Sequence, residues 1–199
     1  MDKTTFAGRK IGFALTGSFC TLDLAVTQMA ALRQMGAEIL PVISNNVRDM
    51  DSRFGTAEYW RKRILDASGA DKIIDNIPDA EPIGPQKLCE IMLIAPCTGN
   101  TISKLANGVI DTPVLLAAKS HLRNAGPLVI AVATNDGLSA NAKNIGKLLN
   151  YKYIFFVPFG QDNPSAKPNS LVAHMEQIPQ TLEAAFAGKQ IQPILTCQA

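Results

Sequence analysis

Residues 91–101 read IMLIAPCTGNT, an unbroken apolar run that passes directly into a turn of small and hydroxyl-bearing residues. Runs of this kind are typical of strands that are buried on both faces of a parallel sheet. Thr98 and Thr101 belong to the residue types that begin helices. We therefore expect a buried strand over 91–95 and a helix through Asn107, which together form the repeating unit of α/β folds.

Four more apolar runs follow the same plan, at residues 10–15, 38–44, 128–133 and 154–157. Segments with apolar residues at helical spacing separate them, near 22–32, 59–65, 114–121 and 139–149. This alternation predicts an α/β fold, a Rossmann-like three-layer sandwich around a doubly wound parallel sheet. No repeat or low-complexity linker interrupts the pattern, so residues 1–199 are predicted to be a single domain.

Some segments carry less regular signals. Residues 45–55 and the long polar stretch 159–170 are predicted to be loops. A last helix is expected over 171–187, with His174 on it. Pro41 lies inside the 38–44 run, and because proline cannot donate to a strand ladder it favours an edge position for that strand.

The composition excludes several classes of protein. The 199 residues carry 19 Lys and Arg against 17 Asp and Glu, a net charge of +2 that is too small for nucleic-acid binding by phosphate neutralisation. No apolar run approaches the ~20 residues of a membrane span, and the N-terminus lacks the apolar core of a signal peptide. The four cysteines show no metal-binding spacing, so we expect a reducing cytoplasm and no metal.

Charged residues are scarce in this chain. They make up 18% of it, against about 25% in an average soluble domain. Either the surface is unusually bare, or other chains bury a part of it.

In a doubly wound sheet, ligands bind beyond the carboxyl ends of the strands. The first strand is followed by Thr16, Gly17 and Ser18, without the glycine pattern of a dinucleotide site. The second ends at Ser44, without the acidic residue that would hold a ribose, so NAD binding here is disfavoured. Backbone N–H groups and hydroxyls at a helix N-terminus instead suit one phosphate monoester. The alternative is that Ser18 or Thr21 simply caps the helix.

The loop after residues 91–95 has the same chemistry. Thr98, Asn100 and Thr101 open a helix that carries Lys104. Two hydroxyl-lined helix N-termini at one sheet edge fit a mononucleotide better than a dinucleotide. Lys104 either reaches the phosphate or makes an ordinary surface ion pair, and Asp111 is expected to be a turn and N-cap residue.

Residues 95–101, followed by Lys104 and Asp111, resemble the Pro-Ala-Ser-Ala-Asn-Thr segment of the flavoprotein family of flavin-containing cysteine decarboxylases. The resemblance implies FMN as the cofactor and a Rossmann-like fold that assembles into homo-oligomers, as trimers or multiples of trimers. Such an assembly would bury surface and account for the scarce charge. The residues implied for cofactor binding are Thr16, Gly17, Ser18, Ser44, Pro96, Thr98, Asn100, Thr101, Lys104 and Asn135.

Two features depart from the family pattern. Its Pro-Ala-Met-Asn motif is replaced by VATN at residues 132–135, which keeps only Ala133 and Asn135. Its catalytic histidine, which follows the second strand, has no counterpart, because the two histidines are His121 and His174, both expected at the surface or an interface. An FMN-dependent decarboxylase is therefore an alternative carried by the resemblance alone.

One subgroup of the family resembles this chain along nearly its whole length. The matches are residues 15–18 (LTGS), 53–55 (RFG), 95–100 (APCTGN, with position 97 variable), 134–136 (TND) and, most specifically, 156–162 (FVPFGQD) with 167–170 (KPNS). The subgroup's implied role is the last step to pyridine-2,6-dicarboxylate in the mother cell of a sporulating bacterium. A dihydropyridine dicarboxylate is oxidised there, together with a separate subunit that binds NAD(P). The alternative from another class is a non-catalytic partner of that subunit.

A dicarboxylate substrate needs cations. Arg53 can hold a carboxylate with two parallel hydrogen bonds, and Phe54 and Lys167 are the other candidates for substrate contact. Asn135 and Asp136 are the candidate catalytic residues, and the proton acceptor stays unassigned. The cysteines at the ligand edge, Cys20 and Cys97, are expected to be small buried hydrophobic residues.

Overall fold

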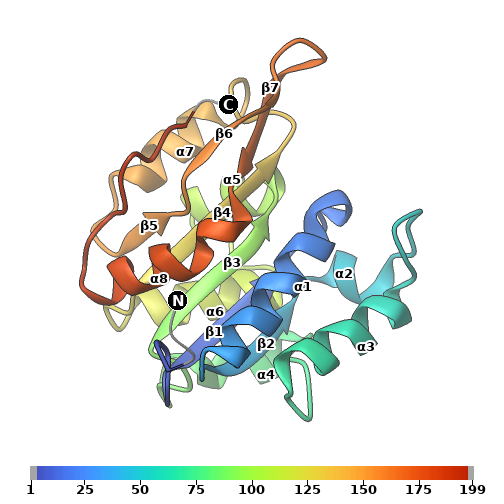
Figure 1. Ribbon diagram of the computed structural model, residues 1–199, viewed down its shortest axis with the longest axis vertical. Helices are drawn as coiled ribbons and strands as arrows, with labels where there is room; N and C mark the ends of the chain where they lie inside the picture. Colours follow the sequence, from blue (N-terminus) through green and yellow to red (C-terminus); the bar gives the residue numbers. More distant parts are fainter. Residues whose placement is uncertain (1–3, 197–199) are drawn as a thin grey trace.

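The parallel part of the predicted sheet is present in the computed structural model, which describes residues 4–196. Its strands are β1 (Lys10–Leu15), β2 (Glu38–Ile43), β3 (Ile91–Cys97), β4 (Leu128–Thr134) and β5 (Ile154–Phe156), in the spatial order β2-β1-β3-β4-β5 (Figure 1). β2 lies at one end of this order, in the edge position that Pro41 favoured.

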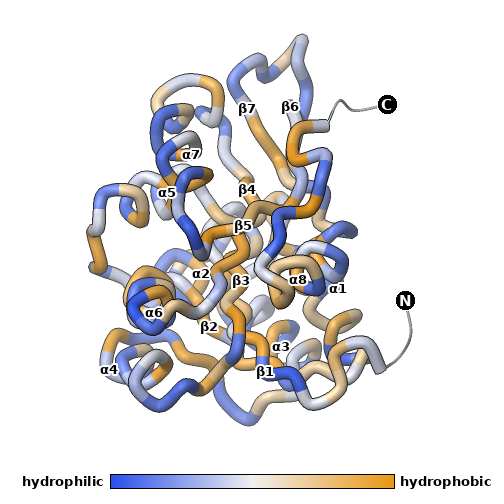
Figure 2. Tube along the Cα trace, turned by 90° about the vertical axis from the view of Figure 1, so that its left-hand side faces the viewer, coloured by the Kyte–Doolittle hydropathy of each residue, from blue (hydrophilic) through white to orange (hydrophobic). Residues whose placement is uncertain are grey.

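Helices cover both faces of the sheet (Figure 2). On one face lie α1 (Phe19–Gln34), α3 (Ala57–Ser68) and α8 (Ile178–Phe186), and on the other α5 (Gly99–Ala106), α6 (Pro113–Leu122) and α7 (Ala142–Leu149). Residues 4–196 also contain four short helices, of which two are α-helical, α2 (Asn45–Asp49) and α4 (Ile77–Ala80), and two are 3₁₀-helical, η1 (Glu81–Ile83) and η2 (Met175–Gln177). The predicted α/β Rossmann-like sandwich is therefore confirmed.

Burial on both faces explains why the central strands are continuously apolar. Every residue of β3 is buried, and so is every residue of β4 except Thr134. α1 adds a stripe at helical spacing that includes Leu22, Met29 and Leu32, each fully buried. Burying one such side chain contributes about 1.5–3 kcal/mol. Across residues 4–196, none of the helices combines the length and the apolar character that crossing a bilayer requires.

The prediction for residues 159–177 is wrong, whereas the last helix is present as α8. β6 (Phe159–Asn163) and β7 (Lys167–Ala173) form an antiparallel hairpin where a loop and the start of a helix were expected. β7 also pairs antiparallel with the end of β4, through Ala133 and Thr134, so the sheet is mixed rather than wholly parallel. The hairpin extends beyond the helices at the top of Figure 1.

Two properties of the sequence conceal this hairpin. Its outer half is exposed, so its residues are polar and show no apolar alternation. In addition, Leu171, Met175 and Ile178 have helical spacing, although they belong to β7, η2 and α8 in turn. As a result, His174 precedes η2 and does not lie on the last helix.

Two other predictions need correction. α2 lies inside the predicted loop 45–55. α7 begins at Ala142 rather than near residue 139, because the carbonyl oxygen of Asp136 accepts hydrogen bonds from the N–H groups of Ser139 and Asn141, which closes a turn before the helix.

His121 is buried within the chain, which corrects its expected place at the surface or an interface. Its Nε2 lies 3.1 Å from the carbonyl oxygen of Pro127, and its Nδ1 lies 3.8 Å from Sγ of Cys89. A carbonyl oxygen can only accept, so Nε2 carries the proton and Nδ1 faces the thiol, whose pKa burial raises to about 12. Burial lowers the pKa of His121, and the hydrogen bond to Pro127 opposes this only in part.

We therefore expect the folded protein to lose stability as the pH falls below about 6.5. The unfolded chain takes up a proton on His121 near its ordinary pKa of 6.5, whereas the folded chain does so only at lower pH. Urea titrations at about pH 7.5 and about pH 5.5 measure the effect on the free energy of unfolding. His121→Asn should reduce the difference between the two pH values, and an undiminished difference would contradict this assignment.

Candidate functional site

A pocket of about 220 Å³ lies at the carboxyl ends of β1, β2 and β3. Residues after each of these strands meet there with the start of α6. The lining consists of Thr16, Gly17, Ser44, Asn45, Asn46, Thr98, Asn100, Thr101, Lys104, Asp111, Thr112 and Leu115. The structure thus brings most of the residues predicted for the cofactor into one pocket, while Ser18, Pro96 and Asn135 lie outside its lining.

Thr16 ties the ends of β1 and β3 together at this pocket. Its hydroxyl donates to the carbonyl oxygen of Pro96 at 2.7 Å and accepts from the N–H of Thr98 at 2.9 Å. The side chain is fully buried. Its hydroxyl is therefore committed to holding the two strand-end turns side by side, and Pro96 takes part through its carbonyl group.

The start of α5 is packed unusually close to the end of β4. Thr98 caps the helix, with its hydroxyl oxygen accepting from the N–H of Thr101 at 3.4 Å. Gly99 follows, and a Cβ at this position would lie 2.6 Å from Oδ1 of Asp136 and 2.7 Å from Nδ2 of Asn141. Because glycine has no side chain, the first turn of α5 can pack this close to the end of β4 beside the pocket.

The first turn of α1 has no side-chain cap. Ser18 occupies the N-cap position without a capping hydrogen bond, and its hydroxyl accepts from that of Thr21 at 2.9 Å. The alternative that Ser18 or Thr21 caps this helix is therefore wrong. This helix of 16 residues begins next to the lining residue Gly17, and within residues 4–196 no side chain caps its first N–H groups, so the positive end of the helix dipole lies beside the pocket.

Ser44 supplies an unpaired polar group in the pocket lining. Within residues 4–196 its Oγ is buried and has no hydrogen-bond partner, and the residue is 8% exposed. Leaving a buried hydroxyl unpaired costs about 1–3 kcal/mol. A ligand with an acceptor oxygen would satisfy this hydroxyl, so the residues present fit a phosphate group.

Lys104 is the basic residue of the lining. Its Nζ lies 2.7 Å from Oδ2 of Asp111, which is the ion pair expected under one alternative. Lys104 also lines the pocket, as the alternative of a phosphate contact requires. The expectation that Asp111 is an N-cap is wrong, because Thr112 caps α6 by accepting from the N–H of Leu115 at 3.3 Å.

The candidates for substrate contact do not line the pocket. Arg53 and Phe54 are exposed in the loop between α2 and α3, with the guanidinium carbon 4.8 Å from the ring centroid of Phe54. Lys167 is exposed on β7, where its Nζ lies 2.6 Å from Oδ2 of Asp162 on β6. The structure does not bring these three side chains together.

Asp136 follows β4 beside Gly99 and is held by its neighbours. It accepts hydrogen bonds from the hydroxyl of Thr134 and from Nδ2 of Asn141, at 3.0 and 2.8 Å to its two oxygens. Burial raises its pKa, but these hydrogen bonds outweigh burial and hold the pKa below its usual range. Such a carboxylate is a weak base, which argues against Asp136 as a proton acceptor. Asn135, the other catalytic candidate, is exposed.

Sequence analysis missed several lining residues. Asn45 and Asn46 directly follow β2, so the strand-end rule that selected Ser44 would have included them. Thr112 and Leu115 lie at the start of α6, which follows a helix rather than a strand, so no comparable signal marks them.

The remaining cysteines and hollows are poorer candidates. Cys97 is fully buried, and burial raises the pKa of its thiol. Cys20 is exposed, which corrects its expected burial, and Cys197 lies outside the described residues.

A wide hollow of about 550 Å³ beside the end of α7 is open to solvent and contains none of the predicted site residues. Within residues 4–196, no group of three or more His, Cys, Asp or Glu side chains is placed to hold a metal ion.

Comparison with known proteins covers nearly the whole chain. A family model described as Flavoprotein matches residues 2–187. The B subunit of dipicolinate synthase from Bacillus subtilis (strain 168) is 48% identical over 192 residues, 96% of this chain and 96% of that protein. The crystal structure of the corresponding B subunit from Bacillus halodurans C has a TM-score of 0.89 at 45% identity and covers 100% of both chains. The FMN-dependent cysteine decarboxylase SpaF shares the fold, with a TM-score of 0.68 at 18% identity over 92% of this chain and 97% of that chain.

Proposed function

Because this chain belongs to the flavoprotein family, we propose that its pocket binds FMN and that the protein is one of the subunits of a dipicolinate synthase. In this proposal it works with the separate NAD(P)-binding A subunit of that enzyme, and with further copies of itself. Together they oxidise dihydrodipicolinate to dipicolinate, pyridine-2,6-dicarboxylate, in the mother-cell cytoplasm of a sporulating bacterium. The name of the Bacillus subtilis relative supports both the product and the need for a second kind of subunit.

The observation that carries the cofactor proposal is the buried, unpaired hydroxyl of Ser44. It lines a pocket together with residues at the N-termini of α1 and α5, where helix dipoles favour a negative charge. Lys104 adds an ammonium group to the same lining, where it is paired with Asp111 and would be shared with the phosphate. Ser44, Lys104 and the first N–H groups of α1 would hold the phosphate of FMN.

The pocket size agrees with binding of one end of a mononucleotide. Its volume of about 220 Å³ is below the roughly 300–1,000 Å³ of pockets that enclose a whole small ligand. The rest of the cofactor would therefore extend past the pocket. Val109 and Ile110, next to the lining residue Asp111, are 41% and 39% exposed, which supports the proposal that another copy of the chain packs against this side.

The proposed reaction converts a dihydropyridine ring into an aromatic ring by removing a hydride and a proton. When bound, a flavin supplies an acceptor for the hydride. This chain's own contribution is to fix the phosphate, so that the cofactor is held in one orientation relative to the substrate.

Among the candidates for substrate contact, Arg53 is the better placed. Within residues 4–196 its guanidinium makes no ion pair, so its donors are free to bind a carboxylate in the two-bond geometry of an arginine fork. The ammonium group of Lys167 is already paired with Asp162. We propose that Arg53, with Phe54 beneath it, meets a substrate carboxylate, and that Lys167 has a secondary part.

One observation favours a second candidate function, that of a non-catalytic partner of the NAD(P)-binding subunit. The hydrogen bonds that Asp136 accepts make it a weak base, and Asn135 has no titratable group to take up the proton. Assays of the NAD(P)-binding subunit with and without this chain distinguish the two functions. Full turnover in the absence of this chain would favour the structural role.

A titration of the apo protein with FMN, followed by quenching of flavin fluorescence, tests the cofactor proposal. Ser44→Ala is expected to weaken FMN binding by about 10-fold or more, since a hydrogen bond to a charged group contributes about 1.5–3 kcal/mol. The same change removes an unpaired buried hydroxyl, so the apo protein should unfold at equal or higher urea concentration. Ser165→Ala, in the exposed tip of the β6–β7 hairpin, is the matched control and should change neither quantity. Wild-type protein that does not bind FMN would contradict the proposal.

A further inference from the structure

α2 brings three residues to the pocket although it is very short. Ser44 is its N-cap, and Asn45 and Asn46 are its first two residues. The helix is only 5 residues long, buries Val47 alone and has no side-chain cap. Helices of this length are not stable by themselves, so contacts with the rest of the protein must hold α2 in place.

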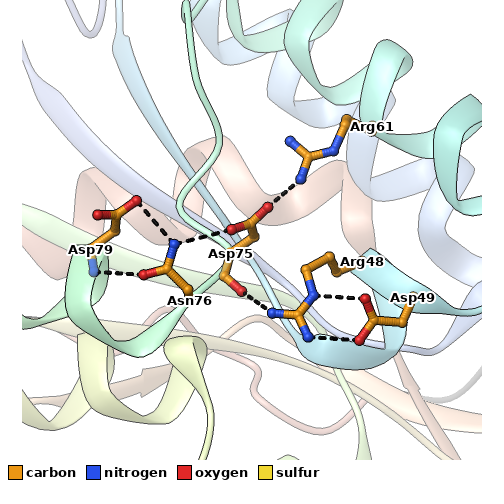
Figure 3. A network of polar contacts seen from close by, with 6 residues as sticks. All are labelled: Arg48, Asp49, Arg61, Asp75, Asn76 and Asp79. Carbon is orange, nitrogen blue, oxygen red and sulfur yellow. Dashed lines mark hydrogen bonds and ion pairs between the residues drawn. The ribbon is translucent and has the colours of Figure 1, made fainter.

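Arg48 provides such a contact. Its Nη1 donates to the main-chain carbonyl oxygen of Asp75 at 2.9 Å, and its Nε and Nη2 donate to the two carboxylate oxygens of Asp49, each at 2.7 Å (Figure 3). One guanidinium thus stiffens the end of α2 through Asp49 and attaches the helix to a segment 27 residues further along the chain.

The segment at Asp75 is a firm anchor because it continues the sheet. The N–H of Ile74 donates to the carbonyl oxygen of Pro41 at 2.9 Å, and the N–H of Ile43 donates to that of Ile74 at 2.9 Å, which pairs Ile74 with the edge of β2. The carboxylate of Asp75 also meets Arg61 of α3 and Nδ2 of Asn76, the cap of α4 (Figure 3). Asp75 therefore joins three helices to the sheet edge.

α2 is positioned on its pocket side as well. The N–H of Ser44 donates to the carbonyl oxygen of Leu15 at 3.0 Å. A Cβ at Gly17 would lie 3.0 Å from Cβ of Asn46, so α2 packs tightly against the turn that begins α1. The pocket side of α2 is thus held by β1 and its far side by Arg48, so the backbone that carries Ser44 is anchored from both sides.

We propose that Arg48 is a positioning residue of the pocket, which fastens α2 to Asp75 and so holds Ser44, Asn45 and Asn46 where they meet the ligand. This inference rests on the proposed function in one respect, namely that the ligand is FMN with its phosphate at Ser44. The attachment of α2 itself does not depend on the ligand. Lysine cannot replace this arginine fully, because a single ammonium group lacks the planar fork that serves a carboxylate and a carbonyl together.

Three variants test the proposal: Arg48→Met, Arg48→Lys and, as the matched control, Arg61→Met. The control removes a neighbouring arginine of α3 that binds the carboxylate of the same Asp75 and, among residues 4–196, makes no hydrogen bond or ion pair with α2. Affinities for FMN and for riboflavin, which lacks the phosphate, are measured for each. Arg48→Met should weaken FMN binding about tenfold, or ~1.4 kcal/mol, and leave riboflavin binding unchanged. Arg48→Lys should restore a part of the lost affinity, and Arg61→Met should leave the ratio of FMN to riboflavin affinity as in the wild type.

Amide hydrogen exchange supplies a readout that needs no ligand. Arg48→Met should raise exchange over residues 44–49 while the central strands stay protected, and Arg61→Met should not. The proposal would be overturned if amide exchange over residues 44–49 were unchanged in both Arg48→Met and Arg48→Lys. It would also be overturned if Arg61→Met lost as much FMN affinity as Arg48→Met. If wild-type protein binds no FMN while exchange over 44–49 still rises in Arg48→Met, the positioning role stands and the proposed cofactor is wrong.

Discussion

Gly99→Ala is expected to destabilise the protein by about 2–4 kcal/mol and to abolish FMN binding at concentrations that saturate the wild type. The new methyl group would lie 2.6 Å from Oδ1 of Asp136 and 2.7 Å from Nδ2 of Asn141, well inside van der Waals contact. These two side chains are hydrogen-bonded to each other, and Asp136 also accepts from the hydroxyl of Thr134, so they cannot move aside without losing those bonds. The first turn of α5 must shift instead, and the pocket residues that it carries shift with it.

Gly146→Ala is the matched control for this substitution. Gly146 lies within α7, and a Cβ there would meet no atom within 4 Å. The change should stabilise the protein by about 0.5–1 kcal/mol, because alanine is the better helix former. Urea titrations and FMN titrations of both variants separate steric conflict from helix propensity. Equal stability of the two variants would contradict the close approach of α5 to β4.

Thr16→Val is expected to cost about 2–4 kcal/mol and to weaken FMN binding at least about tenfold. Valine keeps the shape of threonine but removes the hydroxyl, which donates to the carbonyl oxygen of Pro96 and accepts from the N–H of Thr98. The carbonyl oxygen of Pro96 and the N–H of Thr98 would each lose their hydrogen bond to this hydroxyl and would lie beside a buried apolar side chain. The turns after β1 and β3 would then keep the main-chain hydrogen bond from the N–H of Thr16 to the carbonyl oxygen of Pro96, at 3.3 Å, but lose both side-chain bonds.

Thr16→Ser provides the comparison for Thr16→Val. Serine keeps the hydroxyl and loses only a methyl group, so it should cost about 1 kcal/mol and retain FMN binding. Thermal unfolding, followed by circular dichroism, gives the stabilities, and fluorescence titration gives the affinities. If Thr16→Ser lost as much affinity as Thr16→Val, packing of the methyl group rather than the hydroxyl would maintain the pocket.

The parallel core could be predicted because each of its strands is buried on both faces. A strand made of a continuous apolar run, such as residues 91–95, has apolar side chains on both faces and must therefore lie inside a sheet that is covered on both sides. The hairpin of β6 and β7 could not be predicted by the same rule, since its outer half has no buried face. Its pairing with the end of β4 involves Ala133 and Thr134, residues too far from it in sequence for a local pattern to indicate.

The pocket was predictable for a related reason. Parallel strands place the residues that follow them at one edge of the sheet, so Thr16, Ser44 and Thr98 meet there although they are distant in the chain. Arg53 and Lys167 lie further out on exposed segments, whose direction depends on tertiary contacts rather than on a strand end. Likewise, nothing in the residue type of Asp136 foretells that Thr134 and Asn141 engage its carboxylate.

The hydrogen bond between Thr16 and Thr98 joins positions 82 residues apart in the chain. Closing so long a loop costs conformational entropy, which is recovered only when β1 and β3 pair and are covered. We therefore expect the pocket to form late in folding, once this closure is complete. A nascent or partly folded chain should then offer the flavin no binding site, and we expect the cofactor to bind the folded protein rather than to guide the chain toward its fold.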